Sequence, residues 1–275
     1  MKKILHVILI SLFSLTVISC AKESDSSDSS SSTTSSGLFV VVGDSGTILT
    51  SSDGPTWTSR TSGTSKDLYG ITYGNSTFVV VGDNDSGSVG TILTSSDGIT
   101  WTSRTSGTTK DLWDVNYGNN TFVASDSTGG IRTSSDGISW TSRTSGITSG
   151  IWGGAYGNSK FVVASQGGDI LTSSGGTTWT SRTSGTTSVL NDVAYGNSHF
   201  AAVGDGGTAI TSSDGTSWST QTTGTTTNFK GLTYGNSMWV VVGSGGLIAT
   251  QTAEGDVTER TSGTTNLLYR VIYKE

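Results

Sequence analysis

One short pattern recurs along the chain and sets the spacing of everything around it. It reads Ser-Ser-Asp-Gly, then any residue, then Thr or Ser, then Trp. A fifth copy has lost its Asp, and a sixth, at residues 251–257, has lost both Asp and Trp. The Asp and Trp residues of the five clear copies are Asp53, Trp57, Asp97, Trp101, Asp136, Trp140, Trp179, Asp214 and Trp218.

A second marker, Tyr-Gly-Asn, gives the length of the repeat. It falls at Tyr117, Tyr156, Tyr195 and Tyr234, a regular spacing of about 39 residues. The first copy, at Tyr73, is followed by a longer interval because of an insertion near residues 84–88. Repeats of this length indicate a solenoid, a propeller or an array.

Each repeat predicts four short antiparallel strands. In the second repeat these are residues 68–73, 78–81, 91–94 and 101–105, which we call strands a, b, c and d. No segment has a helical period. Strand b is apolar at every position, so both of its faces are expected to be buried between stacked sheets, as in a propeller.

The two ends of the repeat region are complementary. The region begins with a b strand at residues 39–42 and ends with an a strand at residues 268–273. If the two pair, they complete one blade. The sequence therefore predicts an all-β fold: a six-bladed β-propeller of four-stranded antiparallel blades, with the ring closed by the C-terminal strand joining the N-terminal blade. An open solenoid is the alternative, but it would require capping repeats.

The recurring turn has a structural explanation. An Asp side chain can accept hydrogen bonds from turn N–H groups, the Gly supplies a conformation closed to other residues, and the Trp buries a large ring. The motif resembles the Asp-box of BNR-type repeats, with one residue fewer between Asp and Gly than the commonest form. The resemblance covers Leu38 to Glu275. The Asp copies lie in different blades, so we expect them to stabilise turns rather than to form a site.

The first 37 residues predict export and anchoring. Lys2 and Lys3 precede an apolar run at residues 4–18 that is too short to span a membrane. Residues 17–20, Val-Ile-Ser-Cys, resemble the lipobox of bacterial lipoprotein signals, and Cys20 is the single cysteine. The resemblance implies a signal peptide at 1–19, a lipidated Cys20 with a Ser-rich disordered tether at 20–37, and the propeller at 38–275. An ordinary secretory signal is the alternative.

Charge limits the class of partner. Only 13% of residues are charged and the formal net charge is -6, so the clustered Lys and Arg that nucleic acid requires are absent. We expect a monomer that uses no cofactor and contacts a membrane through lipidated Cys20. Ala21 follows the lipidated residue, with no Asp to suggest inner-membrane retention, so the outer membrane of a bacterial envelope is the expected location.

Some Asp-box propellers are sialidases, which use an arginine triad with a Tyr/Glu pair and an acidic proton donor. Most arginines here instead occupy one repeat position on strand d. This position predicts that they lie on the outer rim of the propeller, where they cannot converge to form a triad. The repeat arginines are Arg60, Arg104, Arg143, Arg182 and Arg260. The lone His199 lies in an a–b turn and supports no catalytic or zinc site. No catalytic residues are predicted.

The insertion contains Asp83-Asn84-Asp85-Ser86-Gly87, whose alternating oxygen ligands resemble the start of a calcium loop. The later ligands are missing, so an ordinary Asp/Gly turn is the favoured interpretation and no metal is predicted.

The second and third positions of strand a differ between otherwise similar repeats. Because strand a lines the channel of a propeller, these side chains are expected at the channel mouth, opposite the Asp turns. They would form a cleft for a sugar or peptide, or else pack between blades. The candidate ligand-binding residues are Tyr69, Trp113, Asp114, Trp152, Asn191, Asp192, Lys230, Tyr269 and Arg270.

These features predict a membrane-anchored binding or scaffold propeller for a protein or glycan. The chain is similar to photosystem II stability/assembly factor-like propellers, which implies the fold and a binding role, although those propellers usually have seven blades. The alternative is a carbohydrate-active propeller, a lectin or sialidase-like glycosidase. A glycosidase requires two facing carboxylates. Asp114 and Asp192 are the one pair available, and their blades are expected to hold them too far apart.

Overall fold

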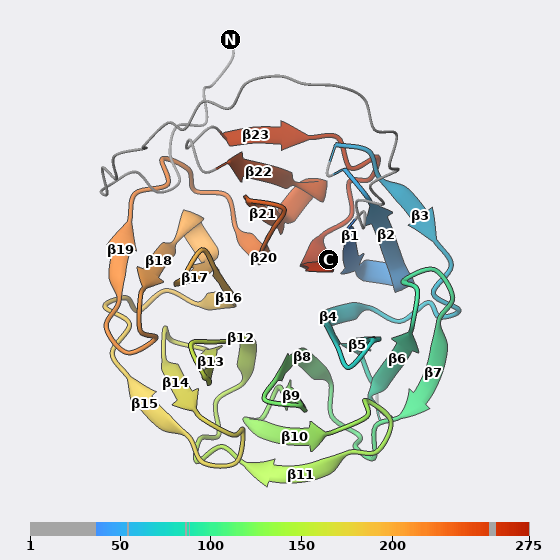
Figure 1. Ribbon diagram of the computed structural model, residues 1–275, viewed down its shortest axis with the longest axis horizontal. Coiled ribbons are helices and arrows are strands. Elements are labelled where there is room, and N and C mark those ends of the chain that lie inside the picture. The colour runs from blue at the N-terminus through green and yellow to red at the C-terminus, as the bar shows by residue number, and fades with distance from the viewer. Residues whose placement is uncertain (1–36, 54, 86, 88, 253–256, 275) are drawn as a thin grey trace, which may run out of the picture.

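The computed structural model describes residues 37–53, 55–85, 87, 89–252 and 257–274. These residues form six separate four-stranded antiparallel sheets arranged as blades around a central axis (Figure 1). The predicted six-bladed propeller is confirmed. The predicted signal peptide, Cys20 and the tether up to residue 36 lie outside the described residues.

The blades are numbered I to VI around the ring, and their strands are given from the centre outward. Blade I contains β24 (Leu268–Lys274), β1 (Leu38–Gly43), β2 (Thr47–Ser51) and β3 (Thr58–Arg60), and blade II contains β4 (Leu68–Gly74), β5 (Thr77–Gly82), β6 (Thr91–Ser95) and β7 (Thr102–Thr105). Blade III contains β8 (Leu112–Gly118), β9 (Thr121–Asp126), β10 (Gly130–Ser134) and β11 (Thr141–Thr144), and blade IV contains β12 (Ile151–Gly157), β13 (Lys160–Ser165), β14 (Ile170–Ser173) and β15 (Thr180–Arg182). Blade V contains β16 (Leu190–Gly196), β17 (His199–Gly204), β18 (Ala209–Ser212) and β19 (Ser219–Gln221), and blade VI contains β20 (Phe229–Gly235), β21 (Met238–Gly243), β22 (Ile248–Thr252) and β23 (Val257–Arg260).

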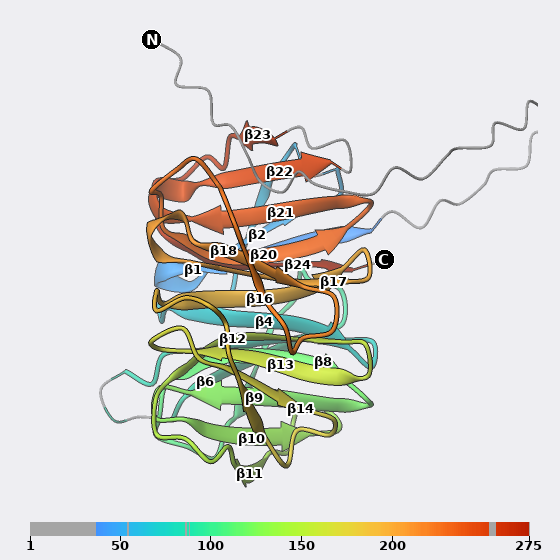
Figure 2. The same cartoon turned by 90° about the vertical axis from the view of Figure 1, so that its left-hand side faces the viewer.

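The ring closes in blade I, where the two ends of the propeller meet. The C-terminal strand β24 pairs antiparallel with β1, with Val40 opposite Ile272 and Val41 opposite Val271. The side view shows β24 lying within the stack of inner strands (Figure 2). This pairing ties the last repeat to the first and covers the inner edge of β1.

The hydrophobic core lies between the blades. Six clusters of buried residues join each blade to the next, including blade VI to blade I. The b strand of each blade supplies residues to both neighbouring clusters, as its uninterrupted apolar sequence predicts. The largest fully buried side chains come from the b strands of blades I to V: Phe39, Phe78, Phe122, Phe161 and Phe200.

The Tyr-Gly-Asn marker joins blades as well as turning the chain. Gly74, at the start of the a–b turn, has no positive φ. Asn75 and Ser76 hold the positive φ values of 45° and 56°. Gly74 is needed because a Cβ there would lie 2.0 Å from Cγ of Tyr117, whose ring packs on the glycine from the next blade.

The Asp of the recurring turn is bonded to the turn's backbone. Asp97 Oδ1 accepts hydrogen bonds at 2.8 Å from the N–H groups of Ile99 and Thr100. These bonds hold the pKa of Asp97 down, at about 2. Equivalent bonds are made by Asp53, Asp136 and Asp214. Gly98 has a φ of +74°, and a Cβ there would meet Leu38 of the preceding blade at 2.9 Å.

The Trp of the turn was predicted to be buried, but it is only partly buried in the structure. The rings of Trp57, Trp101, Trp140, Trp179 and Trp218 are all partly exposed. Each lies against the buried Phe of its own blade; the Phe78 and Trp101 ring centroids are 6.2 Å apart. The ring therefore covers the edge of the core instead of lying inside it.

Candidate functional site at the channel mouth

Each inner strand contains a β-bulge at its second residue. In β4 the register passes from Leu68 opposite Gly82 to Gly70 opposite Val81, which leaves Tyr69 without a partner across the ladder. The same shift occurs in the other five blades. A bulge redirects the side chain of the extra residue. The six bulge residues, which we call the mouth ring, are Tyr69, Trp113, Trp152, Asn191, Lys230 and Tyr269.

All six residues of the mouth ring line one cavity of about 320 Å³, together with Leu267 and Arg270. The cavity lies at the end of the channel where the d–a and b–c loops run, opposite the Asp turns. Seven of the nine candidate ligand-binding residues are thus brought together. The other two, Asp114 and Asp192, line a second cavity deeper in the channel. Arg270 lines both cavities, so its side chain lies between them.

The third position of the inner strands alternates between glycine and a charged residue around the ring. Gly70, Gly153 and Gly231 stand in blades II, IV and VI, and Asp114, Asp192 and Arg270 stand in blades III, V and I. A Cβ at Gly153 would lie 2.5 Å from Cα of Asp192 and 2.8 Å from Nη2 of Arg270. The glycines therefore provide the space in which three charged side chains meet.

Arg270 reaches across the channel axis and joins five blades. Its Nε lies 3.3 Å from Oδ1 of Asp114 and 3.6 Å from Oδ1 of Asp192. Its other nitrogens donate to the backbone carbonyls of Trp152 and Lys230. The expectation that Asp114 and Asp192 lie far apart is therefore wrong, because both contact the same atom.

Burial perturbs both carboxylates of this buried cluster. Asp114 and Asp192 are 3% and 4% exposed. Burial raises the pKa of Asp192 to about 7 although Arg270 opposes the shift, and the charge of Asp114 raises it further. Burial also raises the pKa of Asp114, against the effect of Arg270. One guanidinium faces two carboxylates, so a proton shared between them would leave the cluster close to neutral.

Four aromatic rings from consecutive blades form one side of the mouth. The ring centroids of Tyr269 and Tyr69 are 5.2 Å apart and their planes meet at 84°, while the Tyr69 and Trp113 centroids are 5.8 Å apart. Trp152 continues the row by an edge contact with Trp113. We call Tyr269, Tyr69, Trp113 and Trp152 the aromatic crescent.

The opposite side of the mouth is polar and internally paired. Lys230 Nζ lies 2.7 Å from Oδ1 of Asp205, and Asn191 Nδ2 donates to the same oxygen at 2.8 Å. Partial burial acts to raise the pKa of Asp205, but the hydrogen bonds from Lys230 and Asn191 hold it below its usual value. The ammonium of Lys230 therefore has its counter-charge in place.

Carboxylates surround the aromatic crescent. Burial raises the pKa of Tyr69 well above its usual range, and nearby negative charges add to this effect; they are those of Asp83, Asp67, Asp111 and Asp44. Burial also raises the pKa of Tyr269, with the charge of Asp44, to which its hydroxyl is hydrogen-bonded, as the next cause. We call Asp44, Asp67, Asp83 and Asp111 the acidic rim.

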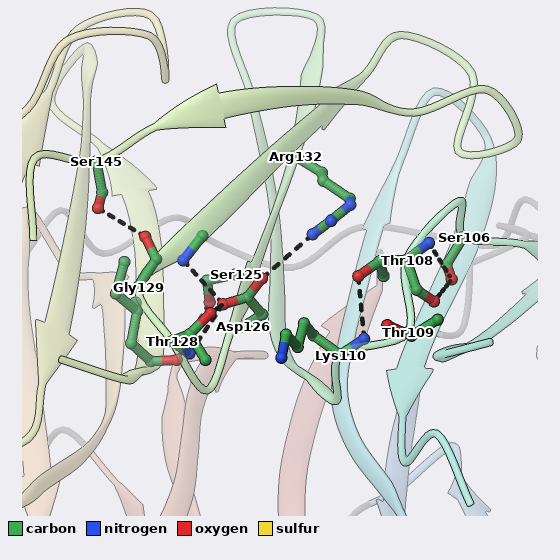
Figure 3. A network of polar contacts seen from close by, with 12 residues as sticks. Ser106, Thr108, Thr109, Lys110, Ser125, Asp126, Thr128, Gly129, Arg132 and Ser145 are labelled. Atoms are coloured by element: carbon green, nitrogen blue, oxygen red, sulfur yellow. Dashed lines mark hydrogen bonds and ion pairs between the residues drawn. The ribbon is translucent and has the colours of Figure 1, made fainter. Parts of the chain in front are cut away.

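Hydrogen bonds hold the loops around the mouth in place (Figure 3). In blade III, Asp126 Oδ1 accepts from the N–H groups of Thr128 and Gly130, at 2.9 and 2.8 Å, and Ser145 Oγ donates to the carbonyl of Gly129 at 2.6 Å. Arg132 lies 3.3 Å from Asp126. Arg132 and Arg270 are the two arginines outside the repeat position on strand d, and this pairing accounts for Arg132.

The insertion forms an Asp turn where it is described. Asp83 Oδ1 accepts from the N–H groups of Asn84 and Asp85, at 2.6 and 3.2 Å, and Asp85 lies 3.7 Å from Nζ of Lys66. Ser86 lies outside the described residues. The described part of the chain contains no group of three or more His, Cys, Asp or Glu residues arranged to hold a metal ion.

The rim arginines make one repeated contact. Nε of Arg104 donates to Thr94 Oγ1 at 2.9 Å, on the neighbouring c strand. The same bond is made by Arg60, Arg143, Arg182 and Arg260. These arginines join outer strands in different blades, so they do not converge.

Sequence reasoning missed the residues that surround the mouth ring: Asp44, Asp67, Asp111 and Asp205. All four lie in b–c or d–a loops, or at their ends, on the face of the mouth. A search for carboxylates in those loops would have found them. Elsewhere, His199 is exposed, with its Nδ1 2.9 Å from the carbonyl oxygen of Asn197.

Comparisons with known proteins support the architecture. No protein-family model and no curated protein sequence matches the chain. A structure from the nidogen/laminin complex matches with a TM-score of 0.69 and 12% identity, covering 87% of this chain and 98% of the other. YCF48 bound to D1 peptide matches with a TM-score of 0.53 and 17% identity, over 81% and 77%. The WD40 propeller domain of Doa1 matches with a TM-score of 0.58 and 12% identity, over 83% and 87%. At these identities the likeness establishes the fold.

Among the residues that the structure describes, no helix is long and apolar enough to cross a membrane.

Proposed function

We propose that this chain is a lipid-anchored protein of the bacterial envelope whose propeller binds a protein or glycan ligand without catalysis. One observation carries the binding role: the second residues of the inner strands, at which the repeats differ, line a single cavity. Six bulges direct the mouth ring into that cavity, while the residues that build the blades repeat. Side chains that differ between repeats and gather at one cavity are typical of a ligand site on a repeated scaffold.

The proposal of a non-catalytic role rests on the charged cluster below the mouth. Asp114 and Asp192 are close together, as a glycosidase requires, but each faces the guanidinium of Arg270 and both are buried. A cation therefore occupies the space that a glycosidic bond would need. The cluster is better suited to holding five blades in register than to proton transfer.

Two structural neighbours agree with a binding role. One belongs to a nidogen/laminin complex, and another is bound to a D1 peptide. These comparisons show only that the fold is shared. That this chain also binds a protein segment is part of our proposal.

The anchoring half of the proposal rests on residues 1–37 alone, and it has a direct test. Metabolic labelling with an alkyne fatty acid in a bacterial host should label the wild-type chain and leave Cys20→Ser unlabelled. Fractionation would then assign the label to the inner or outer membrane. Labelling of Cys20→Ser to the wild-type level would contradict the anchor.

The binding half is tested with the mature wild-type chain on arrays of glycans and peptides. Retention should fall at least tenfold for Trp152→Leu, which removes one ring of the mouth. The matched control is Asp136→Asn, which changes an exposed turn on the opposite face. Equal retention of both variants and the wild type would contradict a site at the mouth.

The second candidate is a carbohydrate-binding propeller. An aromatic wall opposite Asn191 and Lys230 is an arrangement that fits the apolar face and hydroxyl groups of a sugar ring. The glycan array separates this candidate from peptide binding.

A further inference from the structure

The four rings of the aromatic crescent all line the mouth cavity, on one side of it. Tyr269, Tyr69, Trp113 and Trp152 come from blades I to IV, and successive rings meet at angles of 84°, 39° and 88°. Rings set at such angles do not stack flat on one another, and their π systems border the cavity from several directions. The π face of an aromatic ring carries partial negative charge, so a cage of this kind attracts a cation that has given up part of its hydration.

The acidic rim adds carboxylates on the same side, although burial raises the pKa of Asp44 and Asp111. The charges of Asp83, Asp67, Asp111 and Asp44 all act on Tyr69. In the described part of the chain, no ion pair within 4 Å joins any of these four carboxylates to a Lys or Arg; Lys110 acts on Asp111 from a greater distance. The rim thus makes the crescent the more negative side of the mouth.

The two cations that line the cavity carry their own counter-charges. Lys230 is paired with Asp205, and Arg270 with Asp114 and Asp192. Neither therefore cancels the acidic rim. A metal ion would need a set of oxygen ligands, and the described residues contain no group of three or more His, Cys, Asp or Glu side chains arranged to hold one.

We propose that the aromatic crescent and the acidic rim bind an organic cation, an alkylammonium head group, inside the mouth cavity. This inference rests on the proposed function, because it names the chemistry that the mouth recognises. A cavity of about 320 Å³ admits one such group. The group is supplied either by a free small molecule or by a lysine or methylated lysine side chain of a protein partner.

The test is a calorimetric titration of the mature wild-type chain with choline and with its neutral isostere, 3,3-dimethylbutan-1-ol. Choline should bind at least tenfold tighter than the isostere, and its affinity should fall as salt is added. A short peptide containing trimethyl-lysine distinguishes the sources. If the peptide binds with the same affinity as choline, the alkylammonium head group alone accounts for binding and a free small molecule can supply it. If the peptide binds tenfold tighter than choline, the cation belongs to a protein partner.

Paired variants separate ring chemistry from folding. Tyr69→Phe keeps the ring and should retain choline affinity, whereas Tyr69→Leu should lose it about tenfold. Asp67→Asn should weaken binding several-fold. Asp136→Asn, on the opposite face, should have no effect. Thermal denaturation of each variant verifies that it is folded.

Absence of choline and trimethyl-lysine binding, or equal binding of the isostere, would overturn the organic-cation proposal. If glycans or uncharged peptides are then retained in a manner that depends on Trp152, the proposed binding function stands without it. If no array ligand depends on Trp152, both proposals fail.

Discussion

Nε of Arg270 lies 3.3 Å from Oδ1 of Asp114, although 156 residues separate them in the chain. The two residues come from blades I and III, so the contact exists only when the ring is closed. Closure of the ring therefore supplies the buried carboxylates of Asp114 and Asp192 with their counter-charge, Arg270.

Arg270→Met should destabilise the fold by about 3–5 kcal/mol, because it leaves Asp114 and Asp192 buried without a counter-charge. Urea denaturation measures the loss. The matched control is Arg143→Met, at an exposed rim position, which should change the free energy of unfolding by about 0.5 kcal/mol or less. Similar losses in both variants would contradict a special role for the buried cluster.

Asp192→Asn should flatten the pH dependence of stability. In the folded chain the pKa of Asp192 is about 7, above that of an unfolded Asp, so the unfolded chain releases this proton first as pH rises. The free energy of unfolding of the wild type should therefore fall between about pH 4 and pH 7, and then level off. Denaturation series at several pH values check this; parallel profiles for the two proteins would count against it.

Gly118→Ala should be strongly destabilising, by about 3 kcal/mol or more, because the new Cβ would lie 1.9 Å from Cγ of Tyr156 in the next blade. Gly175→Ala is the matched control. A Cβ added there would meet open space, and Gly175 has no positive φ, so the change should stay below about 1 kcal/mol. Calorimetric melting of both variants tests the contrast.

Trp101→Ala should cost about 2 kcal/mol, less than the roughly 3–5 kcal/mol of a fully buried aromatic residue, because the Trp101 ring is only partly buried against Phe78. Chemical denaturation monitored by circular dichroism measures the change. A loss below about 0.5 kcal/mol would mean that the ring does not contribute to the core edge.

The fold could be predicted in detail because each blade repeats the same local pattern. Positions such as Phe78 and Tyr73 recur at one spacing, and the leftover strands at residues 39–42 and 268–273 complement each other. Local turn chemistry also acts through near neighbours, so the bonds of Asp97 follow from the residues beside it. Predicting those hydrogen bonds required no knowledge of the ring.

The candidate site could be predicted only in part. Disagreement between repeats pointed to Tyr69 and Trp113, but the bulge that turns them into the mouth depends on strand register, which residue order does not reveal. The partial exposure of Trp101 likewise depends on how closely neighbouring blades pack.

The number of blades, their strand order and the partner strand that closes the ring follow from residue order, because repetition and turn chemistry are local. Folding of the whole ring is what brings Arg270, Asp114 and Asp192 into one buried cluster and places acidic loops beside four aromatic rings. Those relationships depend on the radius of the closed ring, across which residues far apart in the chain face one another.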